Sequence, residues 1–201
     1  LVFPLKTAAL ERAFGVFEKA GPSARRSAFD RFCMEQDHWL SNYALYSALS
    51  EAFQAKPWWE WPKGLSTRDP QALDVAKKEH AKRIRFHQWL QWVCDEQWAR
   101  VRQQAKARHI LLCGDEPFII GQDSADCWAN AKYLRRDARL GVPPDDFSVD
   151  GQDWGLPWFD FEAMEKDGVG WIRARAARER RGPRQPLGPR LTPALGPHDE
   201  R

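Results

Sequence analysis

The first half of the chain has apolar residues at the spacing of amphipathic helices. Between residues 25 and 53, Phe, Trp, Tyr and Leu recur every three or four positions, with mostly polar residues between them. This pattern predicts one or two helices. A second helical pattern runs from residue 70 to about residue 108, and Asp69 and Pro70 suit its N-cap and its first turn. We therefore expect residues 1–108 to be largely α-helical, with a tryptophan-rich loop between the two patterns.

The pattern changes after His109. Residues 110–113, Ile-Leu-Leu-Cys, form a short apolar run without helical spacing. This run predicts a strand buried on both faces, as in a parallel sheet flanked by helices. Asp115 follows it, and sites are commonly built at the carboxyl ends of parallel strands. The simpler alternative is that Asp115 caps a loop or pairs with an arginine.

Residues 141–160 combine three prolines, three glycines and four aromatic side chains. This composition excludes a helix or a central strand and predicts an ordered loop, since linkers rarely contain tryptophan. Phe147 and Trp154, interleaved with Asp145 and Gln152, have the composition of a sugar site, where rings pack on the sugar and polar groups bind its hydroxyls. The same residues would also suit a loop anchored by packing, and both alternatives stay open. A short helix capped by Asp123 or Ser124 precedes this segment, and a further helix is expected over residues 161–180.

The excess positive charge lies in the C-terminal tail. The formal net charge is +3, but the last 30 residues hold eight arginines and three acids, so the preceding residues are slightly acidic. A nucleic-acid partner, suggested by the net charge alone, is therefore not expected. No apolar run approaches the roughly 18 to 20 residues that span a bilayer, so we expect no membrane partner.

Several enzyme classes and cofactors lack support in the sequence. It contains no phosphate loop, dinucleotide fingerprint, serine-hydrolase elbow or zinc-protease motif. Its four cysteines and five histidines have no metal-ligand spacing. We expect no cofactor and no metal, buried reduced cysteines, and a cytoplasmic location. Carboxylate chemistry on a glycoside remains as the enzymatic interpretation.

Four consecutive motifs point to one enzyme family. They are Gly-Asp-Glu-Pro-Phe-Ile-Ile at residues 114–120, Asp-Ser-Ala-Asp-Cys-Trp-Ala-Asn at 123–130, Gly-Val-Pro-Pro-Asp-Asp-Phe-Ser at 141–148 and Gly-Gln-Asp-Trp-Gly-Leu-Pro at 151–157. In this order they resemble the 4-α-glucanotransferases called amylomaltase or disproportionating enzyme, glycoside hydrolase family 77. Upstream segments around Trp39, Trp58 and Phe86 are also similar to the family, so the resemblance covers about residues 29–173.

The resemblance implies a fold, a reaction and a set of binding residues. The fold is α/β, a partial (β/α)₈ TIM barrel with helical insertions over residues 1–181. The reaction is transfer of a 1,4-α-glucan segment to the 4-hydroxyl of another glucan or of glucose, through a covalent glycosyl-enzyme. Asp115 matches a donor-site contact, residues 145–148 match a mobile loop over the cleft, and Trp154 matches an aromatic side chain beside the glucan. The residues expected to bind α-1,4-glucans or maltooligosaccharides are Asp115, Asp145, Phe147, Ser148, Gln152 and Trp154.

The sequence departs from the family at its end. The Arg-x-Asp-His motif that carries the family's nucleophile is absent, and the general acid Glu is expected further downstream, so we assign no catalytic residue. Residues 182–201 contain five prolines and predict an irregular, disordered tail, which we interpret as out-of-frame translation or the broken end of a fragment. We therefore expect an incomplete 4-α-glucanotransferase that is inactive alone. The alternative is a non-catalytic glucan-binding protein that keeps the aromatic loop.

Overall fold

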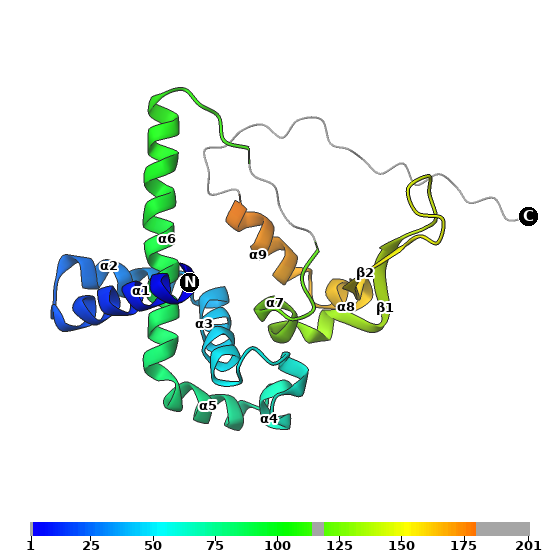
Figure 1. Cartoon of the computed structure of the whole chain (residues 1–201), viewed down its shortest axis with the longest axis horizontal. Helices are drawn as coiled ribbons and strands as arrows, with labels where there is room; N and C mark the ends of the chain where they lie inside the picture. The colour runs from blue at the N-terminus through cyan, green and yellow to red at the C-terminus, as the bar shows by residue number, and fades with distance from the viewer. Residues whose placement is uncertain (1, 114–118, 180–201) are drawn as a thin grey trace, which may run out of the picture.

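The computed structural model describes residues 2–113 and 119–179, which are mostly helical with one small sheet (Figure 1). The first half contains α1 (Val2–Lys19), α2 (Ala24–Glu35), α3 (Asp37–Ala52), the 3₁₀ helix η1 (Trp58–Glu60), α4 (Lys63–Ser66), α5 (Pro70–Glu79) and α6 (Ala81–Ala107). The second half contains α7 (Ala125–Ala129), η2 (Ala131–Tyr133), β1 (Leu134–Val142), β2 (Gln152–Phe159), α8 (Phe161–Lys166) and α9 (Gly170–Glu179). None of the helices in these ranges is long and apolar enough to cross a membrane.

The helical character of the first half is confirmed, and each of the two helical patterns divides into two helices. Asp69 caps α5 as predicted, because its Oδ2 accepts a hydrogen bond of 2.9 Å from the backbone N–H of Ala72, with Pro70 in the first turn. The pattern that was expected to continue to residue 108 breaks at His80, whose backbone N–H donates to the carbonyl of Ala76. The break lets α5 and α6 run in different directions, as Figure 1 shows.

Two hydrophobic clusters hold the helices together. The first joins α3, η1, α5, α7 and the segment before α7, and its buried residues are Leu45, Leu49, Trp58, Trp61, Leu73, Ala76, Ile120, Cys127 and Trp128. The second joins α1, α2 and α6 through Phe14, Phe29, Phe86, Trp89 and Trp92. Burying one Phe side chain stabilises a fold by roughly 1.5–3 kcal/mol, so tryptophans and phenylalanines supply much of the driving force here.

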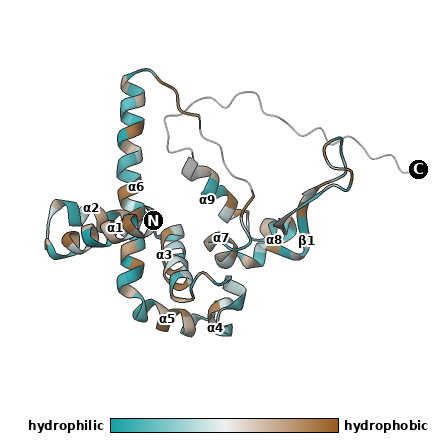
Figure 2. Ribbon diagram, in the orientation of Figure 1, coloured by the Kyte–Doolittle hydropathy of each residue, from teal (hydrophilic) through white to brown (hydrophobic). Residues whose placement is uncertain are grey.

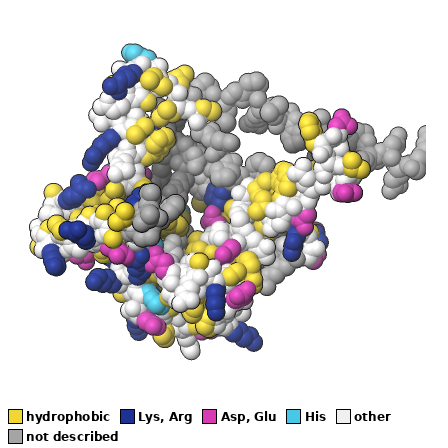
Figure 3. All heavy atoms as spheres, in the orientation of Figure 1, with side chains coloured by type: hydrophobic (Ala, Val, Ile, Leu, Met, Phe, Trp, Pro, Cys, Tyr) yellow, Lys and Arg dark blue, Asp and Glu magenta, His cyan; other side chains and the backbone are white. Residues whose placement is uncertain are grey.

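The predicted strand over residues 110–113 is wrong. This segment has neither helix nor strand geometry, and its first three side chains are 54%, 77% and 40% exposed. It appears as an apolar stretch after α6 in Figure 2, and hydrophobic atoms gather at this end of α6 in Figure 3. A buried parallel strand needs neighbours to pair its backbone groups, whereas the sheet of the described residues contains only β1 and β2. The apolar composition is therefore that of a strand, but no partner strands are present in the part described.

The small sheet is an antiparallel hairpin of β1 and β2. Its register runs from Leu134 opposite Phe159 to Val142 opposite Gln152, with irregularities in between. Residues 141–160 were predicted to form a loop throughout, but residues 141–142 and 152–159 belong to strands. In a two-stranded sheet each strand has a free edge, so the prolines and glycines that exclude a central strand are tolerated.

The cysteines are less buried than expected. Cys127 is buried in the first cluster and Cys33 is half-buried, but Cys94 and Cys113 are exposed. Cys94 lies on α6 and Cys113 lies shortly after it, where the described residues provide little cover. The predicted tail over residues 182–201 lies outside the described residues.

Candidate functional site

The β1–β2 hairpin carries five of the six predicted substrate-binding residues. Three lie in its loop and two at the start of β2. In chain order they are Asp145, Phe147, Ser148, Gln152 and Trp154. The sixth, Asp115, lies outside the described residues. The hairpin extends away from the helices, so its loop lies at the edge of the molecule in Figure 1.

The hairpin exposes several large apolar side chains. Phe147 and Val149 in the loop are 95% and 87% exposed, and Trp154 and Trp158 on β2 are 45% and 38% exposed. Yellow hydrophobic atoms lie beside magenta acidic ones at the hairpin tip in Figure 3. Exposed aromatic rings next to carboxylates form the kind of surface on which a sugar ring can pack.

The polar side chains of the hairpin bind within the hairpin itself. Asp145 Oδ1 accepts hydrogen bonds from the backbone N–H groups of Phe147 (2.9 Å) and Ser148 (2.8 Å). The indole Nε1 of Trp154 donates to Gln152 Oε1 at 3.0 Å, which orients both side chains at the start of β2. These contacts give Asp145, Gln152 and Trp154 a structural role in the hairpin.

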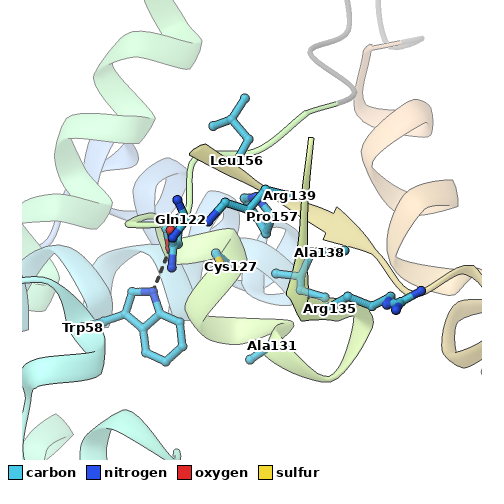
Figure 4. Close-up of a pocket in the computed structure, with 10 residues that line it drawn as sticks. Trp58, Gln122, Cys127, Ala131, Arg135, Ala138, Arg139, Leu156 and Pro157 are labelled. Atoms are coloured by element: carbon cyan, nitrogen blue, oxygen red, sulfur yellow. Dashed lines mark hydrogen bonds between the residues drawn. The ribbon is translucent and has the colours of Figure 1, made fainter. Parts of the chain in front are cut away.

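A small cavity lies at the base of the hairpin (Figure 4). Trp58 forms one wall and donates a hydrogen bond of 2.9 Å from its indole Nε1 to the carbonyl of Gln122, while Arg135 and Arg139 of β1 line the other side. Its volume of about 60 Å³ holds one or two water molecules, well below the roughly 300 Å³ or more of ligand pockets. A larger hollow of about 640 Å³ opens between α3, α4 and α5 and contains no hairpin residue. Sequence reasoning did not single out either arginine, since neither belongs to a motif.

The segment before α7 is fixed to the first hydrophobic cluster. Asp123 Oδ1 accepts hydrogen bonds from the Tyr46 hydroxyl (2.7 Å) and the backbone N–H of Trp58 (3.3 Å). Burial and this hydrogen bond raise the pKa of Tyr46 far above its usual value. Of the two predicted caps of α7, Ser124 is therefore the one used, through a 3.1 Å bond from the N–H of Cys127. Asp123 therefore links the segment before α7 to both α3 and η1.

Charged side chains elsewhere join helices to one another. Among residues 2–113 and 119–179, no group of three His, Cys, Asp or Glu residues is placed to hold a metal ion. Arg83 of α6 instead bonds Glu51 of α3 (Nη2 to Oε1, 2.8 Å) and Glu11 of α1 (Nη1 to Oε1, 2.6 Å). The hairpin therefore remains the candidate site.

Comparison with known proteins gives a consistent relationship. The family model described as 4-alpha-glucanotransferase matches residues 1–181. The 4-alpha-glucanotransferase of Thermus thermophilus is 38% identical over 181 residues, 86% of this chain and 36% of that protein. The 4-alpha-glucanotransferase of Synechocystis sp. is 36% identical over 173 residues, 83% of this chain and 34% of that protein.

A solved structure agrees with the sequence comparisons. The amylomaltase from Streptococcus agalactiae in complex with acarbose has a TM-score of 0.81 at 28% identity, covering 89% of this chain and 37% of that chain. The chain thus spans about a third of the length of the relatives that it matches. With the family match over most of its length, the chain belongs to the 4-alpha-glucanotransferases, glycoside hydrolase family 77.

Proposed function

We propose that this chain supplies one wall of the glucan-binding cleft of a cytoplasmic 4-α-glucanotransferase built on a (β/α)₈ barrel. Residues 1–181 would belong to the catalytic unit and residues 182–201 would form a separate tail. The observation that carries the proposal is the exposed aromatic hairpin, which lies within the residues matched by the family. The relatives are named 4-alpha-glucanotransferases, and the reaction proposed for the whole enzyme is transfer of a 1,4-α-glucan segment to another glucan or to glucose.

The covalent chemistry of such a transfer requires groups that this chain does not supply. A retaining enzyme uses two carboxyl groups roughly 5–5.5 Å apart, one as nucleophile and one as acid and base. The 201 residues contain no Arg-x-Asp-His motif, which carries the nucleophile in the family that the sequence resembles. Loss of a nucleophile removes orders of magnitude of rate. We therefore propose a binding role for these residues and no catalytic role.

Incubation of the purified chain with maltotriose tests the catalytic half of this proposal. We expect no glucose release above a protein-free blank, while the Thermus thermophilus relative serves as the positive control. Glucose release that scales with the amount of this chain would show that it contains a complete catalytic centre.

A second candidate is a non-catalytic maltooligosaccharide-binding protein, which the exposure of Phe147 and Trp154 on a folded hairpin favours. Titration of tryptophan fluorescence with maltoheptaose distinguishes the two candidates. One wall of a cleft should bind with a Kd near the millimolar range, whereas a complete binding site should reach about micromolar. Trp154→Ala should abolish the response, and Trp98→Ala, at a tryptophan that is 50% exposed on α6, should preserve it.

A further inference from the structure

An apolar strip lies exposed at the C-terminal end of α6. Cys94, Trp98 and Val101 are exposed on the helix, and their spacing of four and three residues places them on one face. Residues 110–112, Ile-Leu-Leu, are exposed as well, and hydrophobic atoms gather at this end of α6 in Figure 3. Single exposed apolar side chains are common, but several in one place are typical of a contact surface. We call Cys94, Trp98, Val101 and residues 110–112 the α6 strip.

The backbone at the end of α6 fixes where residues 110–112 leave the helix. The N–H of His109 donates to the Lys106 carbonyl at 3.1 Å, and His109 has a φ of +56°, in the left-handed region. The N–H of Ile110 donates to the Ala105 carbonyl at 2.9 Å. Two such bonds around a left-handed residue form the Schellman motif, which ends a helix in a defined direction. The strip is therefore positioned by local hydrogen bonds, although its side chains lie exposed.

Residues 110–112 also have unpaired backbone groups. Within the described residues, Leu111 and Leu112 form no backbone–backbone hydrogen bond, and the sheet there consists of β1 and β2 alone. A short apolar run with unpaired N–H and C=O groups is suited to pair with a strand of another sheet, which gives it hydrogen bonds and apolar contacts together. The apolar face of α6 would then cover one side of that sheet, as helices do in α/β proteins. The α6 strip therefore fits a partner that presents a sheet.

The comparison with relatives identifies a polypeptide of this kind. The match covers 36% of the Thermus thermophilus relative, so about two thirds of that protein have no counterpart here. A second copy of this chain is a poorer occupant, because residues 97–113 contain four Arg or Lys and no Asp or Glu. Two copies that paired through their strips would bring these positive charges together.

We propose that the α6 strip is a docking surface for the remaining two thirds of a 4-α-glucanotransferase, and that it holds them even when they form a separate polypeptide. Residues 110–112 would pair with a strand of that polypeptide, and Trp98 and Val101 would pack against its sheet. This inference rests on the proposed function, since it assumes that the chain supplies one part of such an enzyme. It adds that the surface is preformed, because the Schellman motif places the strip before the partner binds.

Coexpression tests the docking surface. The 201-residue chain is produced in the same cells as the unmatched two thirds of the Thermus thermophilus relative, which carry an affinity tag, so that the two parts can fold together. We expect the untagged chain to copurify with the tagged part. Leu111→Asp should reduce the copurified amount at least about tenfold, because it buries a charge in the contact. Val16→Asp, at a side chain of α1 that is 70% exposed, is the matched control and should leave the amount unchanged.

Two further substitutions at the same position separate strand pairing from apolar contact. Leu111→Pro removes a backbone N–H that pairing requires and should prevent copurification, whereas Leu111→Val keeps it and should copurify like the wild type. Because Leu111 is 77% exposed, all these variants should keep the circular dichroism spectrum of the wild type. Equal copurification of Leu111→Asp and the wild type would overturn the inference, as would failure of the wild-type chain to copurify.

The activity of the copurified pair distinguishes this inference from the proposed function. Glucose release from maltotriose by the pair, but by neither part alone, supports both. A copurified pair that neither releases glucose nor binds maltoheptaose shows that the proposed function fails while the docking surface holds. Sedimentation of the chain alone should show a monomer, and a dimer that Leu111→Asp dissociates would overturn the inference in favour of a second copy.

Discussion

His87 is a buried histidine next to a carboxylate. It is 8% exposed, and its Nε2 lies 3.2 Å from Glu51 Oε1. Burial lowers the pKa of His87; the Glu51 charge opposes this shift and the Arg83 charge adds to it. Burial would raise the pKa of Glu51, but the hydrogen bond from Arg83 and the charges of His87 and Arg83 outweigh it and lower that pKa.

These shifts predict a loss of stability in mild acid. Below the ordinary histidine pKa of 6.5, the unfolded chain takes up a proton at His87 that the folded chain resists, so the free energy of unfolding falls. Below the ordinary Glu51 pKa of 4.5, a second loss in the same direction is added. Urea unfolding at about pH 8 and about pH 5.5 should show a smaller difference in His87→Gln than in the wild type. His38→Gln, at an exposed histidine of α3, is the control and should show the same difference between the two pH values as the wild type. The prediction would be contradicted if His87→Gln lost as much free energy of unfolding at about pH 5.5 as the wild type does.

Trp128 is the largest fully buried side chain of the first hydrophobic cluster. Its side chain is fully buried, its Nε1 donates to the Leu65 carbonyl at 2.9 Å, and the Arg68 guanidinium lies 4.1 Å from its ring centroid. Trp128→Ala should reduce the free energy of unfolding by about 3–5 kcal/mol, because it leaves a large cavity. In the same urea titrations, Trp98→Ala at an exposed position should cost less than about 1 kcal/mol. Similar losses in both variants would mean that the cluster is not packed as described.

At the scale of elements, α5 shows how a local signal starts a helix. Asp69 binds the N–H of Ala72, and Asp69→Ala should lower the free energy of unfolding by about 1 kcal/mol. Asp74→Ala is the matched control within the same helix, since Asp74 forms an exposed ion pair with Lys77 at 3.2 Å that should contribute at most about 0.5 kcal/mol. Thermal unfolding followed by circular dichroism measures both, and a larger effect of Asp74→Ala would refute the assigned cap.

Helices were predictable at this scale and strands were not. Helical spacing and the Asp69-Pro70 start are local properties, so they survive in any surroundings. The hairpin was missed because β1 contains three arginines and β2 contains glycine and proline, and their pairing is visible only when both strands are brought together. Residues 110–113 were assigned to a strand because their short apolar run is typical of one. The run shows composition only, and the described residues provide no neighbouring strand to pair with it.

At the scale of the whole molecule, the chain joins a slightly acidic body to a basic tail. The charge arithmetic predicts that any binding to duplex DNA resides in residues 172–201 and weakens steeply with salt. Filter binding of the full chain and of a variant ending at residue 171 tests this prediction. Salt-sensitive binding that survives the truncation would show that the body itself carries a nucleic-acid surface.

The sequence by itself determined the family, the helical first half, the cap at Asp69, and the segment that contains the candidate site, because motifs and helical periodicity are local. The structure chose Ser124 over Asp123 as the cap of α7. Only the tertiary structure decided that Asp123 binds Tyr46 and Trp58, that β1 pairs with β2, and that residues 110–113 lie exposed. It also showed that Asp145 bonds the backbone of its own loop. These features depend on which partners the folded chain brings within hydrogen-bonding distance, and neither composition nor spacing encodes that distance.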